Sequence, residues 1–435
     1  MTFLLMLRDG VTTYERHVLY PPALFAWHSV LRPFGASPYQ SALLLSQVGG
    51  ALSVGLLYLA ARGYGLSRGV GWITAAAFAL CPASIFFATV VELHGPFMAP
   101  MALAWVVGAR LARRPSIAAA IAVGLATALA TAMHSSGAVL PAPILGAVLL
   151  EAWPGRAPTT LAQRLRLAVL AGIVHALVLL TVTGGMGQFA FVQKMAPVSV
   201  SLPANVPGVL TWEWLWPFLP FSVLFAVGLG HTTWRRLSVV VLLSLPLYLV
   251  PSLLVLAMWR EYGAYLIPVA FPAIAIVVNV LPRRLSLVAL LASATVGIAH
   301  VVRFDHAERP RAYAAGVHAL AGTRPTYLLG GDSDDIEAFF VSLPQAQLIL
   351  MTMPPFLDPT LGAQALAGLD AHLDKALRCD AVVLLTAGTE AALRHPLTLQ
   401  VYPAAGAIVP HLEARYALTP VNTHGFIGRQ LRLRP

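Results

Sequence analysis

Long apolar stretches dominate the first 302 residues. A helix that crosses a bilayer needs about 20 mostly apolar residues. Stretches that approach this length occur at about 39–61, 69–89, 95–112, 117–133, 136–152, 165–185, 213–231, 237–258, 263–281 and 285–302. Residues 2–7 are too short to span and lack the shape of a signal peptide, so we interpret them as the end of a first helix, cut short by a wrong start codon. Residues 21–34 contain three prolines, which favours an interfacial or re-entrant segment.

The pattern changes after residue 302. Thr326–Gly331, Ala346–Met351 and Ala381–Thr386 are short apolar runs typical of buried strands. The intervening residues 332–342 and 369–378 have the spacing of helices. Alternation of strand and helix predicts a small α/β domain with a parallel sheet. The expected fold is therefore a polytopic α-helical membrane protein of about 10–11 spans (residues 1–302), followed by this α/β domain (residues 303–435).

Composition excludes the main alternatives to a membrane protein. Hydrophobic residues make up 58% of the chain, charged residues 11%, and the mean hydropathy is +0.75. Soluble domains carry about 25% charged residues, so a soluble globular protein and a disordered protein are both excluded. The two cysteines, Cys81 and Cys379, give neither a disulfide framework nor a metal signature.

The positive charge of the chain carries topological information. Residues 1–302 contain 17 Lys and Arg against 6 Asp and Glu, whereas residues 303–435 contain 11 against 12. Arginines scattered between apolar stretches indicate membrane orientation, and we expect no nucleic acid partner. If the loop after residues 2–7 lies outside, twelve of the 17 basic residues fall inside. This bias predicts that the C-terminal domain faces the outside. Few Lys beside many Ala and Arg are typical of a GC-rich bacterial genome, so we expect a bacterial inner-membrane protein with this domain in the periplasm.

The same orientation sorts the acids and histidines. Five of the six acids before residue 303, together with His17, His28, His94 and His134, fall on the outer side, and only Glu151 falls inside. Ionisable groups within a membrane domain are costly and are usually functional. The outer face is therefore the predicted location of any chemistry.

The first two outer loops contain acid and histidine candidates. Asp9 is the only Asp in the first 302 residues, and its carboxylate is able to act as a general base; the alternative is a helix cap or a solvated side chain. His17 and Tyr20 belong to the same polar turn, with an interfacial role as the alternative for His17. Glu92 and His94 lie in a loop too short to leave the membrane surface, so they point into a cavity between helices unless they form a surface pair.

The later outer loops contain candidate ligands for an anion. His134 is either a hydrogen-bonding group for such a ligand or a helix-terminal cap. Lys194 is the only cation of its loop, and a phosphate needs a cation or a helix N-terminus. Arg260 and Glu261 lie at the outer boundary, where they either bind a lipid-linked phosphate or anchor the chain at headgroups. His175, in the middle of a helix, is interpreted as a hydrogen-bonded core residue.

Two further sequence features favour ordinary structural roles. The tryptophans of WEWLW (212–216) are typical of an interfacial aromatic belt. GGDSDD (330–335) could imitate a nucleotide loop or a metal site, but a strand-to-helix turn with a capping side chain is favoured. No established metal or nucleotide motif is present, and the sequence leaves open whether a divalent cation takes part.

Taken in order, these loops resemble the GT-C membrane glycosyltransferases, in particular the family-39-like bacterial and protein O-mannosyltransferase group. The resemblance covers about residues 8–280. It is carried by HVLYPPALFAW (17–27), VVELHGPFMA (90–99), GLATALATAMHSSGAVLPAPIL (124–145) and EYGAYLIP (261–268). Two positions depart from the family pattern, because Ala264 replaces its usual Arg and His94 its usual Tyr.

The resemblance implies an inverting glycosyltransferase that moves a sugar, such as a mannosyl or other hexosyl group, from a polyprenyl-phosphate donor to an acceptor hydroxyl. It implies that Asp9 is the base, with Glu15 as the alternative. The remaining positions carried over bind or position the donor or acceptor: His17, Tyr20, Glu92, His94, His134, Lys194, Arg260, Glu261 and Tyr265. The sequence does not choose between a protein, a lipid and a polysaccharide acceptor.

Two other functions are compatible with a polytopic membrane protein. One is a transporter or lipid-handling protein in which the acids and histidines form an ion pathway. The collection of acids at one face and the absence of an inverted repeat argue against it. The other is a noncatalytic scaffold with an outer sensor domain, which accounts for the C-terminal domain but not for the loop acids.

Overall fold

The chain folds into two compact units, which a computed structural model places at Phe3–Phe304 and Asp305–Pro435. The structure describes residues 4, 6–7, 10, 12, 17–154, 157–182, 202–256, 263–303, 308–331, 335, 339, 343, 346–352, 354–423 and 425–434. Each unit has its own hydrophobic interior and is considered separately below.

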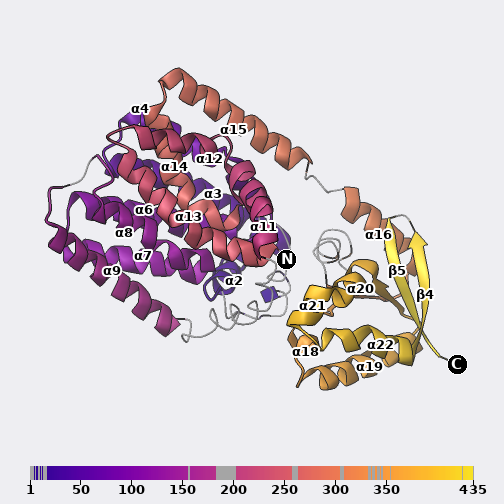
Figure 1. Cartoon of the computed structure of the whole chain (residues 1–435). Helices are drawn as coiled ribbons and strands as arrows, with labels where there is room; N and C mark the ends of the chain where they lie inside the picture. The colour runs from indigo at the N-terminus through magenta and orange to yellow at the C-terminus, as the bar shows by residue number, and fades with distance from the viewer. Residues whose placement is uncertain are drawn as a thin grey trace. The chain divides into compact units, whose positions relative to one another are not determined.

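The first unit is a bundle of apolar helices (Figure 1). In chain order its first half contains α2 (Tyr20–Leu31), η1 (Arg32–Phe34), α3 (Pro38–Gly63), α4 (Arg68–Ala79), α5 (Pro82–Thr89), α6 (His94–Arg113), α7 (Ile117–Met133), η2 (Ser135–Val139), α8 (Pro141–Leu149) and α9 (Leu161–Val182). Its second half contains α11 (Leu202–Val209), η4 (Leu210–Leu215), η5 (Trp216–Phe218), α12 (Phe221–Leu224), η6 (Phe225–Gly230), α13 (Arg235–Leu256), η7 (Ala264–Leu266), α14 (Ile267–Val280) and α15 (Arg283–Arg303). Each of the ten predicted stretches contains helix.

The lengths of these helices fit a membrane protein. Within the described residues, four helices are long and apolar enough to cross a membrane: Pro38–Gly63, His94–Arg113, Leu161–Val182 and Arg283–Val302. The number rises to six if two bent pairs each count as one span. The chain is thus an integral membrane protein with apolar spanning helices.

Two predicted spans are bent rather than straight. The stretch 69–89 consists of α4 and α5, which meet at 58°. Pro82 is the first residue of α5, and Cys81 before it is extended, as expected because a proline disfavours helical geometry in the preceding residue. The stretch 213–231 is part of a second pair, Val206–Phe218 and Phe221–Gly230, which meet at 108°. Apolar length alone does not reveal these breaks.

Glycine allows α3 and α6 to pack closely. A Cβ atom added at Gly49 would lie 2.5 Å from the carbonyl oxygen of Gly95, and one at Gly95 would lie 2.7 Å from Cβ of Ser46. Small residues at such crossings let two helical backbones approach, which is a main source of association between helices in membranes. This contact fixes the N-terminal end of α6, where His94 lies.

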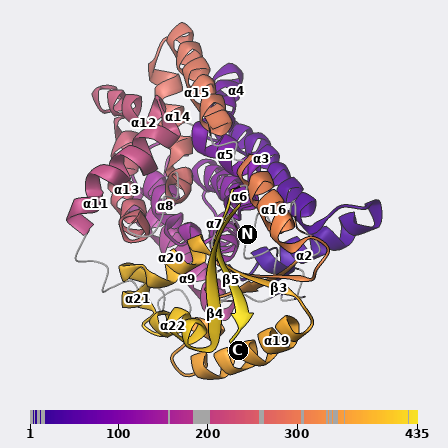
Figure 2. The same cartoon turned by 90° about the vertical axis from the view of Figure 1, so that its right-hand side faces the viewer.

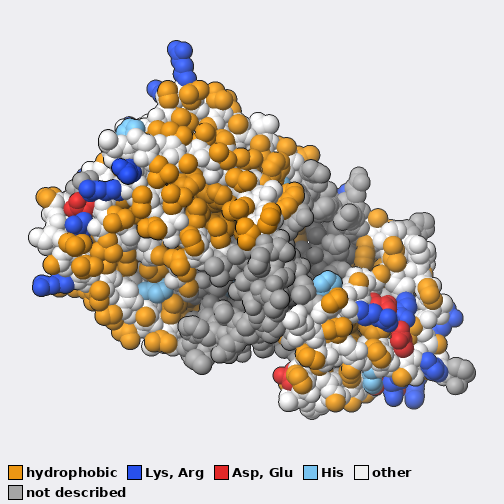
Figure 3. Space-filling model, viewed as in Figure 1, with side chains coloured by type: hydrophobic (Ala, Val, Ile, Leu, Met, Phe, Trp, Pro, Cys, Tyr) orange, Lys and Arg blue, Asp and Glu red, His pale blue; other side chains and the backbone are white. Residues whose placement is uncertain are grey.

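The outer surface of the bundle is apolar. Large hydrophobic side chains are exposed on several helices, for example Leu52, Val169, Leu243 and Leu291. Figure 3 shows hydrophobic side chains over most of this face, with Lys and Arg confined to its rim. A wide apolar surface bordered by cations is the arrangement expected for a protein solvated by lipid.

The second unit is built on a mixed five-stranded sheet of order β2-β1-β3-β5-β4. Figure 2 shows its strands β3, β5 and β4. Its strands are β1 (Thr326–Gly330), β2 (Gln347–Leu350), β3 (Val382–Thr386), β4 (Tyr416–Thr423) and β5 (Phe426–Leu433). β1 pairs in parallel with β2 and β3, whereas β5 is antiparallel to both β3 and β4. Its helices are α16 (Glu308–Ala321), α18 (Pro354–Leu357), α19 (Gly362–Arg378), α20 (Ala387–Arg394), α21 (Pro396–Val401) and α22 (Ala405–Arg415).

The sheet agrees with the three predicted strands and adds two. The predicted parallel pairing holds for β1, β2 and β3, but the sheet as a whole is mixed because a hairpin of β4 and β5 extends it. Gly425 lies in the hairpin turn at φ +89°, a backbone conformation that glycine adopts without steric cost. The helix predicted from residue 369 begins earlier, at Gly362. Of the helix predicted at 332–342, only Asp335 and Phe339 are described, and both are helical.

Hydrogen bonds to the Asp335 side chain hold the turn after β1 in place, so this turn has a structural role. Its buried carboxylate accepts hydrogen bonds from the Gly331 N–H and the Tyr313 hydroxyl, at 3.0 and 2.8 Å. It also accepts from the hydroxyls of Thr386 and Thr389, at 2.7 and 2.9 Å. These four hydrogen bonds compensate for the burial of the carboxylate. They also join the carboxyl ends of β1 and β3.

Ion pairs make the stability of this unit depend on pH. Hydrogen bonds from Arg429, together with the Arg394 charge, hold the pKa of the Glu413 carboxyl below its usual value. For Asp374, hydrogen bonds from Arg415 and Tyr416 outweigh the opposing effect of burial and also lower the pKa. A carboxyl whose pKa is lower in the folded than in the unfolded state stabilises the fold while ionised. This contribution is complete above about pH 4.5, the unfolded value, and is lost as pH falls through the folded value.

We therefore expect hydrogen exchange in β3 and β5 of the full chain, corrected for intrinsic rates, to accelerate as pH falls from about 6 to about 3. Glu413→Gln removes one of the titrating groups and should make this dependence shallower. An equally steep dependence in the variant would show that Glu413 does not contribute.

Candidate functional site

His134 is the centre of a cluster of polar rings at one end of the helical bundle. Ser116 caps the start of α7 by accepting a hydrogen bond from the Ala119 N–H, and the helix ends at Met133. His134 is then extended, and its Nδ1 accepts the N–H of Ser136 at 3.2 Å, so that it caps the following 3-10 turn. Because Nδ1 accepts a hydrogen bond, a neutral His134 carries its proton on Nε2.

Three other polar rings and the Phe97 ring, whose centroid is 5.4 Å away, surround His134. The His17 ring stacks on it with ring centroids 5.1 Å apart and an interplanar angle of 9°. The centroid of the His94 ring lies 4.2 Å from that of His134, and the centroid of the Tyr265 ring lies 5.5 Å from it. Burial lowers the pKa of His134 well below its usual range, and the neighbouring His94 and His17 lower it further. His134 is therefore neutral at physiological pH and offers an Nε2–H donor.

α2 and the residues just before it bring Tyr20 and His17 to this cluster. The N–H of Leu19 donates to the carbonyl of Ala132, at 3.0 Å, which ties the start of α2 to the end of α7. Tyr20 is the first residue of α2 and is completely buried. A residue before α2 and one at the end of α7 are thus held together by a backbone contact.

Glu92 and His94 come from the short connection between α5 and α6. His94 Nδ1 lies 3.5 Å from Glu92 Oε2, which also accepts the Leu93 N–H at 3.0 Å. Partial burial acts to raise the pKa of the Glu92 carboxyl, but the interaction with His94 and the Leu93 hydrogen bond lower it below the usual value. The Glu92 side chain is 40% exposed, whereas that of His94 is 5% exposed. The pair therefore reaches from the surface into the bundle.

His94 has a buried nitrogen available for a ligand. Among the described residues, its Nε2 has no hydrogen-bond partner. A buried polar atom without a partner costs free energy, and such atoms in native structures call for an explanation, of which an absent ligand is one.

The structure thus brings together five of the predicted site residues: His17, Tyr20, Glu92, His94 and His134 lie in one region, and Tyr265 joins them through its ring contact with His134. Five other predicted residues lie outside the described residues, so their positions stay predictions: Asp9, Glu15, Lys194, Arg260 and Glu261. His175 has the predicted structural role, because its Nδ1 lies 3.0 Å from the Thr127 hydroxyl in the bundle interior.

Sequence analysis did not select Glu213 as a site residue. It lies in η4, a π-helical turn, and its side chain is 1% exposed. Its Oε2 accepts the N–H of Gly263 at 2.8 Å. The only sequence signal was an acid between tryptophans in an apolar stretch, where an ionisable residue is unusual.

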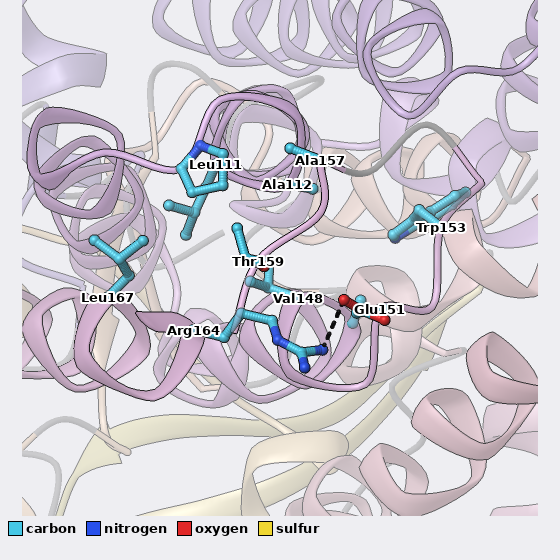
Figure 4. A pocket seen from close by; sticks show the side chains of 11 residues that line it. Leu111, Ala112, Val148, Glu151, Trp153, Ala157, Thr159, Arg164 and Leu167 are labelled. Atoms are coloured by element: carbon cyan, nitrogen blue, oxygen red, sulfur yellow. Dashed lines mark ion pairs between the residues drawn. The ribbon is translucent and has the colours of Figure 1, made fainter. Parts of the chain in front are cut away.

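The opposite end of α6 contains an ion-pair cluster of a different kind (Figure 4). Glu151, at φ +49°, lies 3.3 Å from Arg164 Nη1 and 3.4 Å from Arg236 Nη1. The pocket beside it is lined mainly by apolar side chains such as Leu111 and Val148. These contacts join the ends of α8, α9 and α13, so we interpret Glu151 as a structural residue.

Among the described residues, no group of three or more His, Cys, Asp or Glu side chains is arranged to hold a metal ion. The cluster around His134 is instead a set of aromatic and imidazole rings with one partly exposed carboxylate. Such a set can donate and accept hydrogen bonds and can stack against a ligand.

The bundle, its polar end and the α/β unit define a polytopic helical membrane protein with a C-terminal domain. The structure is similar to that of ArnT from Cupriavidus metallidurans bound to undecaprenyl phosphate, with a TM-score of 0.56 and 14% identity over 99% of this chain and 92% of that chain. ArnT in the apo state gives a TM-score of 0.54 and 16% identity, over 99% and 91% of the two chains. The sequence matches no family model and no curated protein.

An oligosaccharyltransferase from Archaeoglobus fulgidus, in complex with Zn and sulfate, is a weaker match, with a TM-score of 0.43 and 10% identity over 94% of this chain and 64% of that chain. Nothing rests on a likeness at that score. The two ArnT structures are sufficient to confirm the predicted fold class. The narrower likeness to the protein O-mannosyltransferase group stays a prediction.

Proposed function

We propose that this chain is an inverting glycosyltransferase that takes a sugar from a polyprenyl-phosphate donor and transfers it to an acceptor hydroxyl at the membrane surface. The observation that carries the proposal is the cluster of His94, His134 and Tyr265 with Glu92, located at one end of a bundle with the fold of ArnT. Fold alone does not define activity, but ArnT binds a polyprenyl phosphate in the structure that this chain resembles.

The proposed reaction assigns the first-loop acid as base. The Asp9 carboxylate takes the proton of the acceptor hydroxyl while that oxygen attacks the anomeric carbon. The bond from the anomeric carbon to the phosphate oxygen breaks on the opposite face, which inverts the centre and releases the lipid phosphate as an anion. Glu15 is the alternative base.

The leaving phosphate needs positive charge and hydrogen-bond donors more than it needs an acid. His134 offers its Nε2–H, and Tyr265 is able to offer its hydroxyl. We assign the cations Lys194 and Arg260 to the same phosphate on the basis of the sequence. Glu92 and His94 would position the donor or the acceptor, with Glu261, His17 and Tyr20 around them.

We place the site and the C-terminal domain on the periplasmic side of a bacterial inner membrane. The positive-inside distribution of Arg supports this orientation. At the opposite end of α6, Glu151 is bound by Arg164 and Arg236, which agrees with an arginine-rich inner face. The acceptor in this arrangement is a hydroxyl on a protein, a lipid or a polysaccharide.

The test is release of sugar by the purified protein from a panel of radiolabelled polyprenyl-phosphate hexoses, with unlabelled undecaprenyl phosphate as a competitor. Sugar release that the competitor suppresses would support the proposal. A folded protein that releases no sugar from any donor but moves protons or lipid across vesicles would contradict it and favour a transporter, in which the histidine rings form a pathway.

Replacing His94 tests the cluster without removing a packed ring. His94→Phe replaces the unpartnered Nε2 by an apolar edge but also removes the 3.5 Å contact between Nδ1 and Glu92 Oε2. These effects oppose each other, so thermal stability should change little. Sugar transfer should fall about 10- to 100-fold, because a group that positions the reactants is lost. The control is His28→Phe, since His28 bonds to Ser41 away from the cluster and should leave transfer unchanged. Full activity of His94→Phe would remove His94 from the site.

A further inference from the structure

Glu213 is a buried carboxylate that the proposed reaction does not use. It lies on η4 (Leu210–Leu215), and only 1% of its surface is exposed. Turns of π-helix within α-helical proteins are rare and occur often at functional sites. A buried acid must be compensated by hydrogen bonds or charge, so its partner indicates what it does.

One partner of the Glu213 side chain is the backbone of Gly263. Glu213 Oε2 accepts the Gly263 N–H at 2.8 Å, although the two residues are 50 positions apart. Gly263 is the N-cap of η7 (Ala264–Leu266), which continues directly into α14 (Ile267–Val280). Its carbonyl accepts the N–H groups of Leu266 and Ile267, at 2.9 and 3.2 Å. The carboxylate therefore binds the residue at which this helical segment begins.

The geometry at Gly263 admits little movement. Its φ is +83°, a value that favours glycine. A Cβ atom at this position would lie 2.7 Å from Cβ of Pro217 and 2.9 Å from the ring of Phe218. The segment that follows η4 thus packs on Gly263 while Glu213 holds its N–H.

The interaction is a helix cap supplied by another helix. In a capping box, a Glu three residues into a helix accepts the N–H of its own N-cap residue. Here the N-cap N–H of Gly263 is bound by a Glu from a distant part of the chain. The carboxyl oxygen also lies at the N-terminal end of this helical segment, where backbone N–H groups lack partners within the helix.

The segment held in this way carries a residue of the candidate site. Tyr265 follows Gly263 by two positions, and its ring lies 5.5 Å from that of His134. Because Tyr265 is in the first turn after the cap, any change in where this turn begins moves its ring relative to His134.

We infer that Glu213 is a positioning residue, which fixes the start of the helical segment at Gly263 and thereby holds Tyr265 against His134. This inference rests on the proposed function only where it concerns sugar transfer. The conformational part, that the Glu213 carboxylate orders Gly263 and the turn after it, is independent of any activity.

The experiment compares Glu213→Ala, Glu213→Gln and a matched control in the full chain. Gln keeps an oxygen that can accept the Gly263 N–H, whereas Ala leaves that N–H without this acceptor. The control is Trp214→Phe, which removes the indole hydrogen bond to the Ser222 carbonyl, at 3.0 Å, from the same π-helical turn without touching Gly263. All variants are compared after their thermal stability in detergent is measured.

The first readout is hydrogen exchange of residues 263–267, measured by mass spectrometry. We expect Glu213→Ala to accelerate exchange there about tenfold or more, as loss of a buried hydrogen bond predicts, while Glu213→Gln and Trp214→Phe stay close to the wild type. Unchanged exchange in Glu213→Ala, or equal acceleration in Trp214→Phe, would overturn the inference. This result is obtained whether or not the protein transfers sugar.

The second readout is a double-mutant cycle with Tyr265→Phe. If Glu213 acts through Tyr265, Glu213→Ala should lower kcat about tenfold in the wild-type background and much less in the Tyr265→Phe background. Independent effects that multiply would show a general loss of structure and would overturn the positioning role. Absence of transfer by the wild-type protein would refute the proposed function and leave the exchange experiment to decide on Glu213.

Discussion

Asp9→Asn is expected to lower sugar transfer by about 10²- to 10⁴-fold, which is the contribution of a general base. The amide has the shape of the carboxylate but cannot take the proton of the acceptor hydroxyl. Binding of the donor should change little, because the lipid phosphate and the sugar are held by other groups in the proposed mechanism. The loss should therefore appear in kcat and not in KM for the donor.

The measurement is initial-rate transfer from the polyprenyl-phosphate hexose that the panel identifies, over a range of donor concentrations. Glu15→Gln is the matched comparison in the same loop. If Asp9 is the base, Glu15→Gln retains most activity. If Glu15→Gln loses activity and Asp9→Asn retains it, Glu15 is the base. Full activity in both variants would refute a base in the first outer loop.

Gly49→Ala is expected to destabilise the helical bundle by about 1–3 kcal/mol, the usual cost of overpacking. The new Cβ would lie 2.5 Å from the Gly95 carbonyl oxygen and 2.6 Å from Pro96 Cα. Both atoms belong to the backbone, so neither can rotate away, and α6 must move from α3. His94 begins α6, so the same movement should also lower transfer.

Gly55→Ala provides the control on the same helix. Gly55 has no atom within 4 Å of a Cβ built on it. Its replacement by Ala should therefore leave stability unchanged or raise it by up to about 1 kcal/mol, since Gly lowers helix stability relative to Ala. Thermal unfolding of both variants in the same detergent, followed by tryptophan fluorescence, makes the comparison. Similar melting temperatures for the two variants would refute the importance of the α3–α6 contact.

The sequence was informative about helices and strands because each is indicated by the hydropathy of its own residues. Each stretch identified by apolar length contains a helix, and short apolar runs identified β1, β2 and β3. Two helices of the bundle, α2 and α11, lie outside those stretches. The breaks at Cys81 and near Pro220 were missed, because apolar length is the same for a straight and a bent span. β4 and β5 were missed as well, since β5 (FIGRQLRL) carries polar and charged residues although it lies between β3 and the edge strand β4.

The candidate site was predictable as a set of residue types but not as a geometry. An acid or histidine near the end of an apolar stretch is conspicuous, which is how Glu92, His94 and His134 were selected. Whether their rings meet depends on packing between helices that are distant in the chain. Glu213 shows the reverse case, because its importance comes from the Gly263 N–H, a backbone group that no side-chain pattern reveals.

The sequence by itself determined that this protein is a membrane bundle with polar groups near the ends of its apolar stretches and a separate α/β domain, since hydropathy and charge act residue by residue. The tertiary structure decided which of those groups form a site. His17, His94, His134 and Tyr265 are separated by 40 or more residues along the chain. They meet because glycine contacts between α3 and α6, a backbone bond from α2 to α7 and the Glu213 cap on Gly263 set the positions of the elements that carry them.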